Sequence, residues 1–195
     1  MDIIKDIKTS QVWTLMADET TDRANREQMT IVVRYLGKKQ DGEGLIVKED
    51  PVGVMDAFPE IRSAVGISKA EEEVRMTGSN IAAVLVKKTS ELALDTNTLV
   101  AQCYDGAAAM SSQRVGVVAN IKDVAPMADY YHCAMHGLNL ATSRVVAVPV
   151  IRNAQDIMSS TITFVTDGAK REDLLTKIVA TKGAKGKLIK LCTLL

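Results

Sequence analysis

The sequence has no net charge and no long apolar run, and each absence excludes a class of protein. Its 24 Lys and Arg residues balance its 24 Asp and Glu residues. The chain as a whole therefore offers no electrostatic attraction for nucleic acid, and any such contact must come from local patches. Apolar runs such as residues 145–150 fall far short of the ~20 residues of a membrane-spanning helix. Residues 1–10 mix Asp and Lys and lack the apolar segment of a secretory signal.

Cysteine is also scarce, with only Cys103, Cys133 and Cys192. An odd, scattered set favours reduced thiols in the nucleus or cytoplasm over a disulfide framework. Structural zinc normally needs four ligands, and neither Cys103 nor Cys192 has the spacing to complete such a set. We therefore expect all three thiols to be unpaired and free of zinc. With 195 residues, 47% of them hydrophobic, the chain is long enough for one domain with at most a helical appendage.

Alternating apolar residues predict strands in the N-terminal half. Residues 11–17 form a short apolar run that ends at the acidic stretch 18–22, which we interpret as a turn. A second strand is predicted over 28–36 and a third over 45–48, and their short connections favour antiparallel neighbours. The second strand carries a period-two apolar face made of Met29, Ile31, Val33 and Tyr35.

Helices and strands alternate in the rest of the chain. Residues 50–78 are expected to be irregular, with Glu71–Glu73 on a solvated helix face. Ser79 or Asn80 is expected to cap a helix that runs to about Leu94. The further expected elements are a strand over 98–104, a helix capped by Ser111 or Ser112 with Val115, Val118 and Ala119 inward, a strand over 128–133, and helices over 135–148, 150–163 and 171–180. Three antiparallel strands followed by a helical crossover to a parallel strand is the order of a ribonuclease H-like fold.

Two acids follow predicted strands directly: Asp18 after the first and Asp105 after the fourth. If these strands are adjacent and parallel, their carboxyl ends lie together, which is where α/β sheets bind ligands. Converging carboxylates suit Mg²⁺, which takes oxygen ligands and shares them with phosphates. The alternative is that both acids serve as turn formers. Glu19 should point away from Asp18, and Asp22 is expected to be an Asx-type turn residue.

Two further groups of residues are weaker candidates for a site. His136 lies near a predicted helix N-terminus and is expected either to pack or to contact phosphate. His132 and Cys133 are expected in the core. The C-terminal lysines could follow a phosphate backbone or belong to a solvated terminus. The candidate DNA contacts are therefore His136, Lys185, Lys187 and Lys190.

Three motifs together resemble a known family. Residues 17–22 (Ala-Asp-Glu-Thr-Thr-Asp) look like the opening of the transposase-derived domain in hAT-like proteins, a group that includes MYM-type zinc-finger proteins of transposon origin. Residues 102–107 resemble the second acidic motif of that family, and residues 132–140 resemble its Cys-His-Leu-Asn-Leu signature. The resemblance covers roughly residues 3–192. It implies an α/β, ribonuclease H-like mixed sheet, with Asp18 and Asp105 as vestigial catalytic acids that hold Mg²⁺, and DNA as the ancestral partner.

The sequence also departs from that family. Ala109 replaces an asparagine, Gly137 replaces a basic residue, and the family's third acid, a glutamate, lies beyond a large helical insertion. We expect residues 1–150 to be the N-terminal part of the core and 151–195 to begin a truncated insertion. The expected function is that of an incomplete, DNA-related fragment without cleavage activity, able to form homo-oligomers through exposed apolar surface and without a membrane partner. The alternatives are a domesticated protein-interaction module with no nucleic-acid role, and an active nuclease that uses an acid such as Glu172 in place of the missing glutamate.

Overall fold

The computed structural model describes residues 3–22, 24–39, 43–69, 72–145 and 147–181. The chain forms two compact units, Met1–Cys133 and Ala134–Leu195. The first unit holds a sheet and its covering helices, and the second holds helices. The domain boundary expected near residue 150 stays a prediction.

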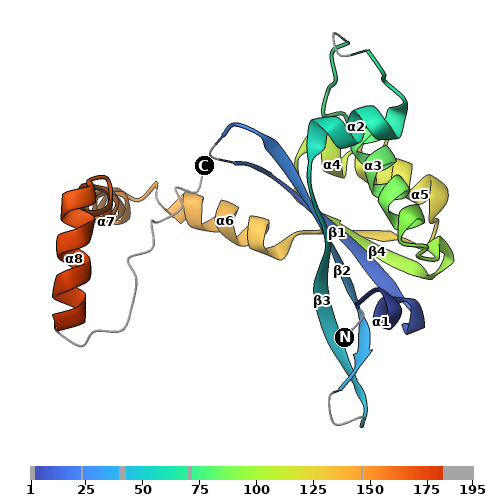
Figure 1. Cartoon of the computed structure of the whole chain (residues 1–195), viewed down its shortest axis with the longest axis horizontal. Helices are drawn as coiled ribbons and strands as arrows, with labels where there is room; N and C mark the ends of the chain where they lie inside the picture. Colours follow the sequence, from blue (N-terminus) through green and yellow to red (C-terminus); the bar gives the residue numbers. More distant parts are fainter. Residues whose placement is uncertain (1–2, 23, 40–42, 70–71, 146, 182–195) are drawn as a thin grey trace. The chain divides into compact units, whose positions relative to one another are not determined.

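The first unit is built on a mixed five-stranded sheet with the strand order β3-β2-β1-β4-β5 (Figure 1). Its strands are β1 (Trp13–Thr21), β2 (Glu27–Lys38), β3 (Leu45–Asp56), β4 (Leu99–Tyr104) and β5 (Asp129–His132). β2 pairs antiparallel with β1 and with β3. β4 pairs parallel with β1 and with β5. The expected α/β mixed sheet, with antiparallel strands first and parallel crossovers afterwards, is confirmed.

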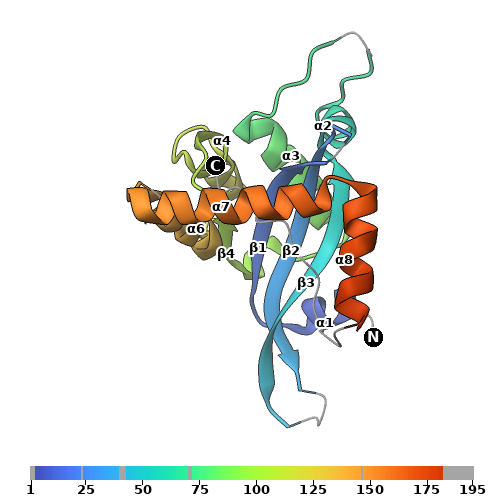
Figure 2. The same ribbon diagram turned by 90° about the vertical axis from the view of Figure 1, so that its left-hand side faces the viewer.

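Helices cover one face of this sheet, as Figures 1 and 2 show. They are α2 (Ala57–Val65), α3 (Gly78–Glu91), α4 (Ala108–Ser111) and α5 (Val117–Val124), while α1 (Ile3–Thr9) packs near β2. The sequence pattern did not predict α1, and the expectation that residues 50–78 are irregular is wrong where α2 forms. The covered face carries the predicted period-two set of β2, all buried: Met29, Ile31, Val33 and Tyr35. Trp13, Leu15 and Ala17 extend it across β1. Because alternate residues of a strand share a face, the hydrophobic pattern decides which side receives the helices.

Two strands are longer than predicted. β1 continues to Thr21, so the acidic stretch 18–22 is mostly strand, paired residue by residue with β2. The turn comes later, over 22–26, where Asn25 adopts a φ of 56°, a conformation that Asn tolerates better than most residues. β3 continues to Asp56 through Pro51, because proline is compatible with an edge strand. Cross-strand pairing thus overrides polar composition in both places.

Some predicted helix positions are also wrong. Glu72 and Glu73 lie outside any helix, and Glu71 lies outside the described residues. The helix expected to begin at Ser111 or Ser112 is instead two short helices, α4 and α5, and Val115 between them is 64% exposed. α3 is capped two residues before Ser79, by Thr77, whose side chain accepts a hydrogen bond from the N–H of Asn80.

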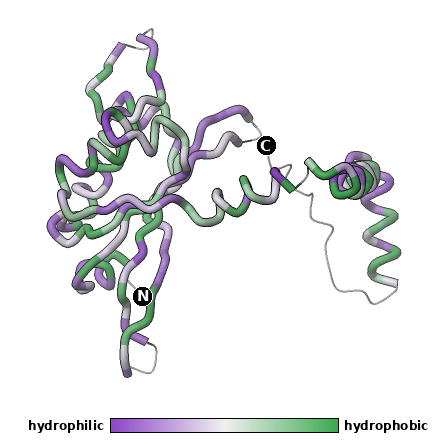
Figure 3. Tube along the Cα trace, turned by 180° about the vertical axis from the view of Figure 1, so that it is seen from behind, coloured by the Kyte–Doolittle hydropathy of each residue, from purple (hydrophilic) through white to green (hydrophobic). Residues whose placement is uncertain are grey.

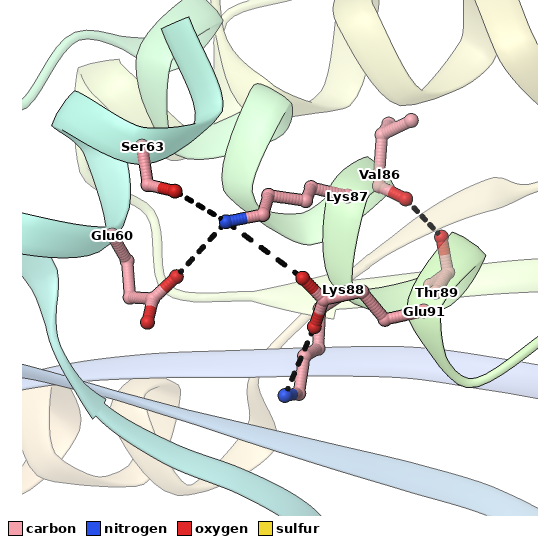
Figure 4. A network of polar contacts seen from close by, with 7 residues as sticks. All are labelled: Glu60, Ser63, Val86, Lys87, Lys88, Thr89 and Glu91. Carbon is pink, nitrogen blue, oxygen red and sulfur yellow. Dashed lines mark hydrogen bonds and ion pairs between the residues drawn. The ribbon is translucent and has the colours of Figure 1, made fainter. Parts of the chain in front are cut away.

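A polar network joins α2 to α3 (Figure 4). The ammonium of Lys87 donates to the hydroxyl of Ser63 at 2.7 Å and pairs with Glu60 at 3.5 Å and Glu91 at 3.7 Å. Beneath it, Ile61 and Leu85 are completely buried. Apolar packing therefore supplies most of the attachment, and the ion pairs lie at its rim.

The second unit consists of α6 (Ala134–Val145), α7 (Pro149–Thr166) and α8 (Ala169–Thr181). These helices were predicted, and Pro149 occupies the first position of α7, where its missing N–H costs nothing. The guanidinium of Arg171 lies 4.6 Å from the ring centre of Phe164.

No residue described in these helices is buried, and the prediction that Leu138, Ala141 and Val145 are buried is wrong: Leu138 is 58% exposed. Figure 3 shows apolar residues along α7 and α8. In the described part of the chain no helix is long and apolar enough to cross a membrane.

Candidate carboxylate site

The sheet brings the ends of β1 and β4 to the same edge. The two strands are parallel neighbours, and Met16 lies opposite Cys103 at the end of their paired segment. Asp18 and Asp105 each follow two residues after those partners. Parallel register therefore places both acids at the same level along the strands.

Asp18 differs from the expectation in one respect: it lies inside β1 and pairs with Thr30 of β2. It is exposed, and one of its carboxylate oxygens accepts a hydrogen bond from the N–H of Glu19 at 3.1 Å. The sequence placed Asp18 after the strand because the apolar run stops there. The strand continues because β2 still supplies hydrogen-bonding partners.

Asp105 follows β4 directly, as predicted, and is half-buried. Its carboxylate accepts a hydrogen bond from the N–H of Ala107 at 3.1 Å, and the hydroxyl of Tyr130 donates to its carbonyl oxygen at 3.1 Å. The carboxylate thus also supports the turn, as the Asp-Gly pair suggested. These contacts orient Asp105 at the end of the strand.

Glu19 is the residue that sequence reasoning undervalued. It does point away from Asp18, and this places it on the half-buried face that continues from Ala17. Its Oε1 is buried without a hydrogen-bond partner in the described part of the chain. Burial raises the pKa of Glu19, and the neighbouring charges of Asp105, Glu27 and Asp18 raise it further. The structure therefore brings Glu19 and Asp105 within electrostatic range of each other. The sequence signal for the partly buried position of Glu19 is the period-two alternation of β1, which continues past Ala17.

Asp22 is a turn residue, as predicted. Its carboxylate accepts hydrogen bonds from the backbone N–H groups of Ala24 at 2.7 Å and Arg26 at 3.0 Å, and from the Arg26 guanidinium at 3.2 Å. The hydrogen bond from the Arg26 backbone is the main cause of its lowered pKa. Asp22 is therefore committed to closing the β1–β2 hairpin.

The histidine motif occupies both units. His132 ends β5 and is exposed, so the prediction that it lies in the core is wrong, because β5 is an edge strand. Its ring lies over Gly106, where an added Cβ would come 3.1 Å from the imidazole. Cys133 is half-buried and donates its N–H to the carbonyl of Tyr104. His136 lies in the first turn of α6, as expected. Lys185, Lys187 and Lys190 lie outside the described residues.

The carboxylates at this edge match the oxygen ligands that Mg²⁺ prefers, but they are few. Among the described residues no group of three or more His, Cys, Asp or Glu side chains is arranged to hold a metal ion. Mg²⁺, however, is commonly bound through one or two carboxylates, with water and phosphate oxygens completing its shell. A buried carboxylate oxygen of Glu19 without a partner, beside Asp105, has the donor chemistry for such a cation. The edge fits a weakly held ion and not a closed metal cage.

Comparison with known proteins identifies the domain. The family model described as the ZMYM1/FAM200 RNase-like domain matches residues 1–116. The match includes β1 to β4 and the acids Asp18, Glu19 and Asp105, and it ends before β5 and the histidine motif. No solved structure matches the chain. Since the match spans more than half of the sequence and the sheet has the expected mixed topology, the chain belongs to the ZMYM1/FAM200 RNase-like domain family, the transposase-derived group of MYM-type proteins.

Proposed function

We propose that this chain is a remnant of an hAT-type transposase catalytic domain, related to DNA and unable to cleave it. The observation that carries the proposal is the pairing of Glu19 with Asp105 at the shared edge of β1 and β4. Carboxylates placed together repel each other, and the charge of Asp105 contributes to the raised pKa of Glu19. A bound cation would reduce that repulsion, and the two carboxylates together would therefore favour binding a cation.

In this proposal Asp105 would hold Mg²⁺ either with Asp18, the other acid of the family resemblance, or with Glu19, whose side chain points to the opposite face of β1 from Asp18. When bound, the ion would stabilise negative charge on phosphate oxygens. Ala107 and Tyr130 fix the orientation of Asp105 through the hydrogen bonds given above. Burial keeps part of Glu19 away from water, which strengthens its attraction to a cation.

Cleavage is not expected from this chain because two-metal phosphoryl transfer holds two ions ~3.5–4 Å apart, each with its own ligands. Asp105 with Asp18 or Glu19 would supply ligands for one loosely bound ion, because among the described residues no group of three or more such side chains is arranged to hold a metal ion. Glu172, the example of a substitute third acid that the sequence offered, lies in α8. The proposal therefore separates ion binding from catalysis.

Affinity for DNA should be weak and sensitive to salt. Several basic side chains of the first unit pair with acids, among them Arg26 with Asp22, Arg34 with Glu49 and Lys122 with Asp129. Each neutralised phosphate contributes to the salt dependence of binding. His136, Lys185, Lys187 and Lys190 remain the proposed contacts, and a nuclear or cytoplasmic location accompanies this proposal.

Binding of Mn²⁺ to the purified chain, followed by electron paramagnetic resonance, tests the ion site. We expect weak binding that falls at least about tenfold in Asp105→Asn and in Glu19→Gln, because a tenfold change corresponds to ~1.4 kcal/mol, a modest share of a charged contact. Glu49→Gln is the matched control, since its carboxylate is on β3 and pairs with Arg34. Equal affinity in all three variants would refute the site.

An end-cleavage assay on labelled DNA with Mg²⁺ or Mn²⁺ tests the expected inactivity. We expect no product with the unmodified chain. Metal-dependent nicking that disappears in Asp105→Asn would mean that the chain supplies a third acid, and the proposed loss of catalysis would then be wrong.

A protein-interaction module is the second candidate, favoured by apolar residues on the edge strand. Leu45, Ile46 and Val47 are each about half exposed, and they lie where β2 and β3 extend beyond the start of β1. Exposed apolar edge strands are templates for pairing with another chain. An Ile46→Lys variant separates the two functions: loss of self-association or partner binding with unchanged Mn²⁺ affinity would favour this candidate.

A further inference from the structure

Cys103 and Cys133 lie on the same face of neighbouring strands, although 30 residues separate them in sequence. β4 and β5 are parallel, with Cys103 opposite Tyr131 and Tyr104 opposite His132. The N–H of Cys133 continues this ladder by donating to the Tyr104 carbonyl at 2.8 Å. Because alternate residues share a face, Tyr131 and Cys133 both lie on the side of Cys103.

The two thiols interact directly. Burial raises the pKa of Cys103, and the nearby Cys133, with which its thiol shares a hydrogen bond, raises it further. Both cysteines are half-buried and neither is in a disulfide. Two reduced thiols in contact, with partial access to solvent, meet the steric requirement for reaction with a small oxidant.

We propose that Cys103 and Cys133 form a reversible intramolecular disulfide when the protein meets hydrogen peroxide. One thiolate attacks a peroxide oxygen, the O–O bond breaks, and a sulfenic acid forms with release of water. The second thiol then attacks that sulfur, the S–S bond forms, and a second water leaves. Two electrons pass from the thiols to one peroxide, so the step balances as two thiols and H₂O₂ giving one disulfide and two waters.

The geometry makes this bond a labile one. Disulfides need Cα atoms about 4.4–6.8 Å apart, and neighbouring strands are ~4.8 Å apart with ~3.3 Å per residue along each strand. Cys133 is offset diagonally from Cys103, so it must shift toward β4 to close the bond. It can do so because it follows the last residue of β5. A bond formed under such strain is readily reduced.

The bridge would join the two strand ends beside Asp105. Cys103 precedes Asp105 by two residues, and His132, next to Cys133, lies over Gly106. Oxidation would thus restrain the turn that carries Asp105. The inference rests on the thiols alone and holds whether or not the edge binds a metal ion.

Peroxide treatment of the full chain, followed by non-reducing peptide mapping, tests the inference. We expect a Cys103–Cys133 linked peptide, in monomeric protein, that disappears with dithiothreitol. A Cys192→Ser variant should give the same result, since it keeps both reacting thiols. Linkage through Cys192, linkage only between chains, or oxidation beyond the sulfenic acid without linkage would each overturn the proposal.

The sulfenic acid intermediate is tested in single variants whose folding is verified by the fluorescence of buried Trp13. Cys103→Ser and Cys133→Ser should each trap a sulfenic acid on the remaining cysteine of the pair, which dimedone labels. If Cys103→Ser does not fold, Cys103→Ala provides the same measurement. Dimedone labelling at neither cysteine would contradict the proposed chemistry.

Discussion

The two compact units use apolar residues in opposite ways. In the first, strands and helices enclose a continuous core that includes Leu15, Ile81 and Leu85, all fully buried. In the second, residues of the same type, such as Leu138, Ile157 and Leu174, remain about half exposed or more. Helix formation by itself buries little surface, and most helical stability comes from tertiary packing. The comparison teaches that the sheet, by uniting distant segments, is what makes the first unit stable.

Truncating a core leucine should have the largest effect and should differ most between units. Leu85→Ala is expected to lower the free energy of unfolding by about 2–5 kcal/mol, because it leaves a cavity beneath α3. Leu174→Ala in α8 is expected to change it by less than about 0.5 kcal/mol, since Leu174 is 58% exposed. Urea unfolding followed by Trp13 fluorescence measures the stability of the first unit in Leu85→Ala. Far-UV circular dichroism follows the unfolding of both variants. Similar losses would remove the distinction between the units.

The same glycine substitution should have opposite signs in the two units. A Cβ at Gly78 would lie 2.5 Å from the Val115 carbonyl oxygen and 2.6 Å from that of Ala109, both of them backbone atoms. Gly78→Ala is therefore expected to destabilise by about 1–3 kcal/mol. A Cβ at Gly137 in α6 would meet nothing within 4 Å. Gly137→Ala should therefore stabilise α6 by up to about 1 kcal/mol, because alanine favours the helical conformation more than glycine does. Thermal and urea unfolding of both variants checks the signs.

Removing the charge of Glu19 should stabilise the first unit slightly, and only at higher pH. Its pKa is raised by folding, so the ionised form opposes folding above that raised pKa. This cost declines as pH falls through the folded pKa and is absent below the unfolded value. Glu19→Gln is expected to raise the free energy of unfolding by less than about 1 kcal/mol near neutral pH, because partial exposure to solvent screens the charge of Glu19. Unfolding at pH 4 and pH 7 measures it, with Glu49→Gln as control; a gain at pH 4 equal to that at pH 7 would refute the charge effect.

Of the interactions compared, surface ion pairs should contribute least to the free energy of unfolding in both units. Lys87→Met removes the contacts to Glu60, Ser63 and Glu91 and should cost at most about 1 kcal/mol. Lys177→Met in α8 removes one pair with Asp173, where both partners are largely exposed, and should cost about 0.5 kcal/mol or less. A double-mutant cycle of Lys87 with Glu60 measures the pair itself. A loss as large as that of Leu85→Ala would mean that the network, and not the core, attaches α2 to α3.

Local pattern predicted the elements that alternate clearly. The period-two residues of β2 identified the covered face, and apolar spacing identified α3 and the three helices after β5. Asp105 was correctly placed at the end of a strand because a short apolar run stops at an Asp-Gly pair. The same signal failed at Asp18, where β1 continues through polar residues.

The failures share a cause, which is that polar strand residues take their conformation from a partner. β2 extends β1 past Asp18, and β2 also carries β3 through Pro51. The burial of Glu19 depends on segments that lie far apart in the chain, and so does the contact between Cys103 and Cys133. A single-sequence pattern records which face of a strand is apolar, but not which strand will lie beside it.

The sequence by itself therefore determined the class of fold, the family motifs and the place of Asp105 at the end of a strand. These follow from local hydrophobic period and from residue types at given spacings. Only the tertiary structure decided that Glu19 lies beside Asp105, that His132 is exposed and that two thiols meet across β4 and β5. The physical reason is that burial and electrostatic neighbours are set by strand register, and register is a property of paired segments.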